Sequence, residues 1–121
     1  MLFRSETSLN TRIELESYLR LIRYALKKQT FDLAERWCER GRKRFPQSQK
    51  LGYLQARVAM AAENWTVAIE RFECLLATSV DPQPTLLVEL ADCLVEAGRM
   101  GEAEAHYLAA YRRGSDVALR G

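Results

Sequence analysis

Proline and glycine are scarce in this sequence, with three prolines and six glycines among 121 residues. The prolines are Pro46, Pro82 and Pro84, so residues 1–45 and 47–81 contain none. Long proline-free stretches favour helix over strand, and the low Pro and Gly content excludes a linker or low-complexity tract. The chain is 48% hydrophobic and 28% charged, as is normal for a soluble globular protein. We therefore expect one domain over residues 1–121.

Long hydrophobic runs are also lacking. No run approaches the roughly 20 apolar residues that a membrane span requires. The first residues, Met-Leu-Phe-Arg-Ser-Glu, contain no apolar stretch of the kind found in a secretion signal. We expect the protein to reside in the cytoplasm, by itself or within a larger cytoplasmic protein.

Residues that carry catalysis or bind metals are few. The three cysteines, Cys38, Cys74 and Cys93, are separated by 36 and 19 residues, which matches no metal-site spacing. Their odd number argues against a disulfide framework and favours small apolar core residues. His106 is the single histidine, and no glycine-rich phosphate loop is present. The sequence therefore predicts a protein that is not an enzyme and has no cofactor or metal.

The charges are distributed unevenly along the chain. Residues 1–60 carry 13 Lys+Arg and 6 Asp+Glu, a net charge of +7, whereas residues 61–121 carry 5 and 10, a net charge of −5. Two solvated faces of opposite sign are one interpretation. The other is a polarised molecule that orients an elongated partner or stacks head to tail.

A pattern recurs three times along the chain. Each copy begins with a large apolar residue (Phe31, Trp65, Met100), has an alanine three residues later (Ala34, Ala68, Ala103) and a further seam residue four positions beyond (Cys38, Phe72, Tyr107). Spacings of three and four place these side chains on one face of a helix. A repeated alanine indicates that another backbone passes close by. The alanines lie 34 and 35 residues apart.

A second helical stretch precedes each of these segments, at about residues 11–28, 49–63 and 85–97. Thr11 and Glu14 fit a capping box, Thr30 and Asn64 fit N-caps, and Gly98 fits a helix stop. The expected buried stripes are Tyr18, Leu21, Ile22 and Ala25 in the first stretch, Ala56 and Ala59 in the second, and Leu87, Leu90, Ala91 and Leu94 in the third. The sequence thus predicts six helices in three hairpins.

A helical-hairpin period of 34 residues with alanine, an aromatic residue and then proline resembles the tetratricopeptide repeat. The third copy fits best, whereas the first has Cys38 in place of the aromatic and the second has Gly52 where a bulky residue is typical. The resemblance implies an all-α, right-handed α-solenoid of three repeats at about residues 15–48, 49–83 and 84–117. It further implies that the first helix of each hairpin lines a concave groove.

Within that groove we expect a peptide or amphipathic helix of a partner protein to bind, so that the protein serves as a scaffold, adaptor or chaperone. Small bacterial chaperones and adaptors are similar to it at the family level. Apolar residues at regular intervals, a basic end and an acidic end are the features expected of this surface. The predicted partner-binding residues are Leu19, Arg20, Arg23, Lys27, Lys50, Tyr53, Leu54, Arg57, Met60, Val88, Glu89, Asp92 and Val95.

Alternatives remain open. After Tyr107, Leu108 and Tyr111 the chain offers only residues 115–121 as a cap, so this end is a stub cap, a contact with another subunit, or a site where a longer repeat array continues. The cations at positions 36, 40, 42, 43 and 44 indicate nucleic acid less well. Few aromatic residues are interleaved with them, and cations are favoured at any helix C-terminus.

Overall fold

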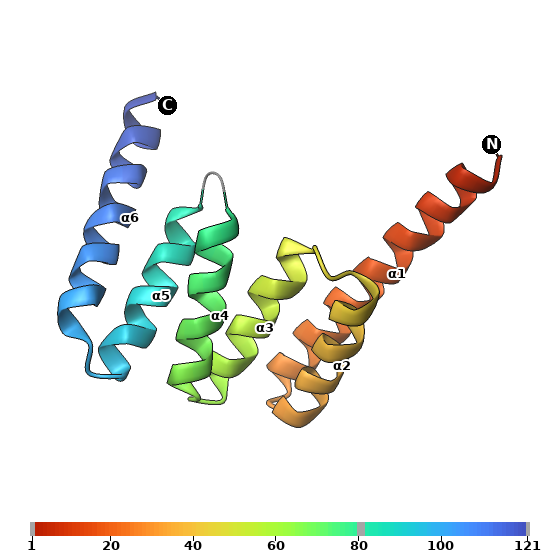
Figure 1. Ribbon diagram of the computed structural model, residues 1–121, viewed down its shortest axis with the longest axis horizontal. Helices are drawn as coiled ribbons and strands as arrows, with labels where there is room; N and C mark the ends of the chain where they lie inside the picture. The colour runs from red at the N-terminus through yellow and green to blue at the C-terminus, as the bar shows by residue number, and fades with distance from the viewer. Residues whose placement is uncertain (1, 80–81, 121) are drawn as a thin grey trace. The chain divides into compact units, whose positions relative to one another are not determined.

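A computed structural model describes the backbone of residues 2–79 and 82–120 and the side chains of residues 9–79 and 82–114. These residues form six α-helices and no strand (Figure 1). The helices are α1 (Leu2–Lys27), α2 (Phe31–Arg44), α3 (Gln49–Ala61), α4 (Trp65–Thr78), α5 (Pro84–Glu96) and α6 (Met100–Arg120). The all-α prediction is confirmed, and α2, α4 and α6 begin at the three residues that open the sequence repeat.

The chain folds as two compact units. The N-terminal unit, Met1–Ala62, contains α1, α2 and α3, and the C-terminal unit, Glu63–Gly121, contains α4, α5 and α6. The boundary falls in the turn between α3 and α4, inside the second predicted repeat. The three-repeat division therefore stays a prediction. The predicted stub cap at residues 115–121 lies outside the described side chains.

The turns into α2, α4 and α6 share one backbone feature. Gln29, Glu63 and Gly98 adopt φ angles of 60°, 62° and 81°, each two residues before the helix begins. Gly98 thus ends α5 as predicted, since glycine adopts this left-handed conformation without steric cost. Thr30 and Asn64 occupy the predicted N-cap positions but form no side-chain cap hydrogen bond. The Thr30 hydroxyl instead donates to the carbonyl oxygen of Ala25 at 3.2 Å, which explains why this cap prediction is wrong in its chemistry.

In the N-terminal unit, α2 packs against α1, and α3 packs against both of them (Figure 1). Gly41 of α2 lies where α3 approaches most closely, because an added Cβ there would be only 3.2 Å from the Leu51 methyl groups. The core contains Leu19, Ile22, Ala25, Ala34, Cys38, Leu51, Leu54 and Val58. Ile22 and Ala25 are buried as predicted, but Leu21 is 39% exposed and Leu19, at 1%, lies in the core instead. The side of α1 that α3 covers decides this difference.

The first helix begins earlier than predicted. Because α1 starts at Leu2, Thr11 lies inside the helix and the expected capping box does not form. Glu14 instead forms an ion pair with Arg44 of α2, with 3.1 Å between Oε2 and Nε. A carboxylate that fits a helix start in the sequence therefore joins two helices in the structure.

In the C-terminal unit, α5 packs against both α4 and α6. The repeated alanines mark close helix contacts in both units, since Ala34, Ala68 and Ala103 are at most 1% exposed. Phe72 is fully buried, and the predicted stripe of α5, from Leu87 to Leu94, lies in the core. These burials confirm the helical periodicity inferred from the sequence.

Candidate functional site

The predicted partner-binding residues of the N-terminal unit divide into two groups. Leu19 and Leu54 are 1% and 5% exposed and belong to the hydrophobic core. Their expected role on a partner surface is therefore corrected. They hold α1, α2 and α3 together, because α3 covers the side of α1 that carries Leu19 and uses Leu54 to do so. The other predicted residues keep exposed or partly exposed side chains.

Five exposed cations of α1 and α3 and one tyrosine make up what we call the basic surface. The cations repeat at helical spacing along both helices, and Tyr53 is half-buried among them. Because α1 and α3 are packed neighbours, equivalent repeat positions such as Arg23 and Arg57 fall on the same side of the unit. Met60 is half-buried on the same face of α3. The basic surface consists of Arg20, Arg23, Lys27, Lys50, Tyr53 and Arg57.

Tyr53 and Arg57 are in direct contact. The Arg57 guanidinium lies over the tyrosine ring, 5.9 Å from its centroid, and its Nη1 donates to the phenol oxygen at 3.4 Å. A guanidinium over an aromatic face is favourable and restricts the motion of both side chains. The pair is one helical turn of α3 and presents an aromatic group and a fixed cation together.

In the C-terminal unit the predicted residues lie on α5, and two of them are engaged by the fold. Glu89 is only 8% exposed, so its carboxylate is not the exposed acidic group that was expected. Asp92 is exposed but accepts a hydrogen bond from the Tyr107 hydroxyl of α6. That hydrogen bond is the main reason why the pKa of Tyr107 is raised to about 12. Val88 is 38% exposed and Val95 is half-buried.

The cations on α2 have local partners. Arg44 pairs with Glu14 and lies over the Phe45 ring, Arg40 lies over Trp37, and Arg42 donates to the carbonyl oxygen of Ser48. These contacts fix the guanidinium groups against the protein's own side chains and backbone. They give the basic run a structural role at the C-terminus of α2.

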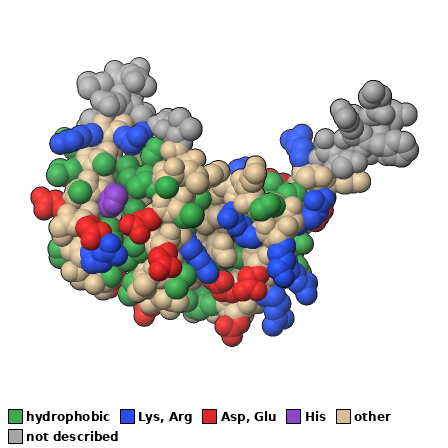
Figure 2. All heavy atoms as spheres, viewed as in Figure 1, with side chains coloured by type: hydrophobic (Ala, Val, Ile, Leu, Met, Phe, Trp, Pro, Cys, Tyr) green, Lys and Arg blue, Asp and Glu red, His purple; other side chains and the backbone are tan. Residues whose placement is uncertain are grey.

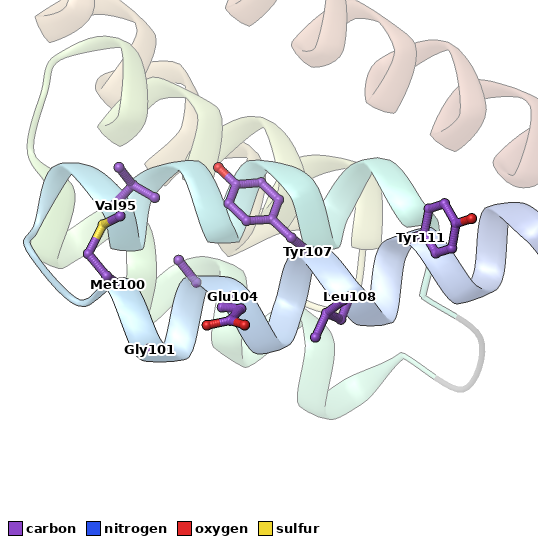
Figure 3. A pocket seen from close by; sticks show the side chains of 8 residues that line it. Val95, Met100, Gly101, Glu104, Tyr107, Leu108 and Tyr111 are labelled. Atoms are coloured by element: carbon purple, nitrogen blue, oxygen red, sulfur yellow. The ribbon is translucent and has the colours of Figure 1, made fainter.

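A third surface of exposed apolar residues was foreseen only in part. A depression of about 560 Å³ lies on the α5–α6 hairpin, lined by Val95, Met100, Gly101, Ala103, Glu104, Tyr107, Leu108 and Tyr111 (Figure 3). The sequence marked Tyr107, Leu108 and Tyr111 as an end that needs a cover. Exposed apolar residues on α1, Leu9 and Ile13, were missed. The polar residues between them, Arg12 and Glu16, gave that helix face no apolar pattern.

The described residues show no group of three or more His, Cys, Asp or Glu side chains that could hold a metal ion. His106, the purple side chain in Figure 2, is half-buried on α6 among hydrophobic side chains. No helix within the described part of the chain combines the length and apolarity needed to cross a membrane.

Comparison with known proteins agrees with this architecture. The family model described as tetratricopeptide repeat matches residues 53–118, more than half of the 121 residues. A search of curated proteins found no match. Members of this family typically act as non-catalytic modules that mediate protein–protein interactions. The matched length, together with paired helices at a period of 34 to 35 residues, shows that the chain belongs to the tetratricopeptide repeat family.

Proposed function

We propose that this protein is a cytoplasmic scaffold, adaptor or chaperone, and that its basic surface binds an acidic segment of a partner protein. The observation that carries the proposal is the set of exposed cations that α1 and α3 bring to one side of the N-terminal unit around Tyr53. Clusters of Arg recognise acidic segments through charge-assisted hydrogen bonds. The proposal also draws on the net charge of +7 in residues 1–60.

The Tyr53–Arg57 pair gives this surface a centre. Aromatic residues and arginine dominate many binding sites, because they combine apolar area with directed hydrogen bonds. The ring already holds the guanidinium of Arg57, so less conformational entropy is lost on binding. A partner segment suited to this site carries Asp or Glu at helical or extended spacing, with an apolar side chain to cover Tyr53.

Fluorescence anisotropy with two labelled peptides tests the charge requirement. Both have the same apolar positions, one with Glu and the other with Lys at every polar position. We expect the Glu peptide to bind, binding to weaken with added salt, and the Lys peptide not to bind. The variant Arg23→Glu/Arg57→Glu should weaken binding of the Glu peptide at least about tenfold, since two favourable charge interactions become repulsive.

The matched control is Arg36→Glu/Lys43→Glu, which reverses two exposed cations on α2 outside the basic surface. This control should bind the Glu peptide about as well as wild type. Equal loss in both variants would mean that net charge alone attracts the peptide, and no loss in either would overturn the proposal. Capture from a source-cell lysate with wild type and with Tyr53→Ala/Arg57→Ala would then name the partner, as the protein retained by the first and lost by the second.

A further inference from the structure

A face of the α5–α6 hairpin exposes an unusual amount of apolar surface. Met100 is 62% exposed, Leu108 48% and Tyr111 74%, although all three are large apolar or aromatic side chains. Figure 3 shows Val95 and Met100 close together at one end of the depression, Tyr107 in the middle and Tyr111 at the other end. This face runs along the length of a helix, as a site for another helix would.

Equivalent positions of the other hairpins' second helices are covered. Tyr107 is 37% exposed, whereas Cys38 and Phe72, which stand at the same repeat position in α2 and α4, are 0% exposed. In the N-terminal unit α3 packs on α1 and α2, and in the C-terminal unit α5 packs on α4. Each covering element is the first helix of a hairpin. The repeat pattern therefore indicates that the open face of α5–α6 fits a helix of that class.

The face of α1 has the matching repeat positions. In α3, the residues that enter the core of the N-terminal unit are Leu51, Leu54 and Val58. The residues 34 positions earlier in α1 are Ser17, Arg20 and Tyr24, and all three are exposed. Leu9 and Ile13 extend the same stripe by two turns and are 57% and 56% exposed. Thus α1 leaves uncovered the face with which α3 packs on the first hairpin.

The charges of these two faces are complementary. Leu9 and Ile13 line a shallow hollow together with Arg12, Glu16, Ser17 and Arg20, so its cations exceed its acids. Glu104 is the charged residue among those that line the α5–α6 depression. Unlike charges placed around an apolar contact set the orientation of two docked surfaces.

We propose that the α5–α6 depression binds α1 of a second copy of this chain, in the way that α3 packs on α1 and α2. Leu9, Ile13 and Tyr24 of one copy then cover Met100, Leu108 and Tyr111 of the next, with Arg12 and Arg20 near Glu104. Such a contact is heterologous, joining two different faces, so it generates rings or open chains of copies. It uses helix faces other than the centre of the basic surface, so it stands or falls separately from the proposed function.

Analytical ultracentrifugation of three single variants tests this contact. Ile13→Glu places an acid opposite Glu104 and disables the α1 face, and Tyr111→Lys places a cation opposite Arg12 and Arg20 and disables the α6 face. The control, Leu33→Glu, adds a charge at a 39% exposed leucine on α2. All three positions are exposed, so each variant is expected to remain folded, which circular dichroism verifies.

We expect the average mass of wild type and of Leu33→Glu to rise with concentration from low micromolar to near-millimolar, while Ile13→Glu and Tyr111→Lys stay monomeric. An equimolar mixture of those two variants should form a dimer and nothing larger, because one intact face of each kind remains. Wild type that stays monomeric throughout, or a mixture that forms no dimer, overturns the proposal. Association that survives Ile13→Glu also overturns it, since α6 would then bind a surface other than α1.

Discussion

The Tyr107 hydroxyl of α6 donates a hydrogen bond to the carboxylate of Asp92 on α5. The two residues are 15 positions apart, and their contact crosses the helix pair that contains the buried alanines Ala103 and Ala110. Asp92 was expected to face a partner, and Tyr107 was expected only as a seam residue. The structure makes them a pair that holds the last hairpin together.

This pair makes the stability of the C-terminal unit depend on pH in the alkaline range. The pKa of Tyr107 is raised to about 12, above the ordinary tyrosine value of about 10, so folding favours the protonated phenol. Its contribution is complete below pH of about 10 and is lost as pH rises towards about 12. Tyr107→Phe should therefore unfold more easily than wild type at neutral pH, by up to about 1 kcal/mol because the pair is partly exposed.

Urea denaturation of wild type and Tyr107→Phe at a series of pH values checks this prediction. The difference in free energy of unfolding should shrink above pH of about 10. A difference that is constant up to the highest pH would show that the hydroxyl contributes through packing and not through its proton.

Leu19 should matter for stability and not for partner binding alone. Leu19→Ala removes a fully buried side chain and should lower the free energy of unfolding by about 2–5 kcal/mol. Leu21→Ala, two residues away on the 39% exposed side of α1, should cost less than about 1 kcal/mol. Denaturant titration of both variants compares them directly, and equal losses would contradict the assignment of Leu19 to the core.

Ala68 should tolerate no large side chain. It is fully buried on α4, which packs against α5. Ala68→Trp should destabilise the protein by about 1–3 kcal/mol or more, because overpacking pushes the helices apart. Thermal melting followed by circular dichroism measures this loss. An unchanged melting temperature would refute the repeat register in which the alanine marks a close helix contact.

The left-handed turn residues should respond to glycine in opposite directions. Gln29 and Glu63 have positive φ angles that cost a residue with a Cβ about 1 kcal/mol. Gln29→Gly and Glu63→Gly should thus stabilise the protein by up to about that amount, although glycine also loses more entropy on folding. Gly98→Ala should destabilise it by about 1 kcal/mol. Urea midpoints of the three variants test this, and a stabilising Gly98→Ala would be the contrary result.

The three cysteines should differ sharply in reactivity. Cys74 is exposed, whereas Cys38 and Cys93 are buried. Burial, with smaller contributions from Asp92, Glu89 and Glu96, raises the pKa of Cys93 to about 11, so little thiolate forms near neutral pH. A chromogenic disulfide reagent should label one thiol rapidly and two only after unfolding. Cys74→Ser should abolish the rapid phase, and its persistence would place a second thiol at the surface.

The helical hairpins were predictable because their signals are local. Side chains at spacings of three and four must share a helix face, so Ala34, Ala68 and Ala103 marked the buried side before any contact was known. The starts of α2, α4 and α6 followed from the large apolar residue that opens each copy, and Gly98 marked the end of α5.

The errors have a different origin. Leu19 and Leu21 flank the same apolar stripe of α1, and the sequence offers no means of telling which flank a third helix will cover. Thr11 and Glu14 have the spacing of a capping box, yet no residue before them breaks the helix, so α1 continues to Leu2. Glu14 then forms its ion pair with Arg44, 30 residues away.

The sequence by itself determined the helices, their pairing along the chain and the opposite charges of the two halves, because each depends on neighbours within a few turns or on composition. Only the tertiary structure decided which side chains are available to another molecule. It placed Leu19, Leu54 and Glu89 out of solvent and left Ile13, Tyr24 and Tyr111 exposed. Exposure depends on what packs against each helix face, and that is a property of elements distant in sequence that no spacing within one helix encodes.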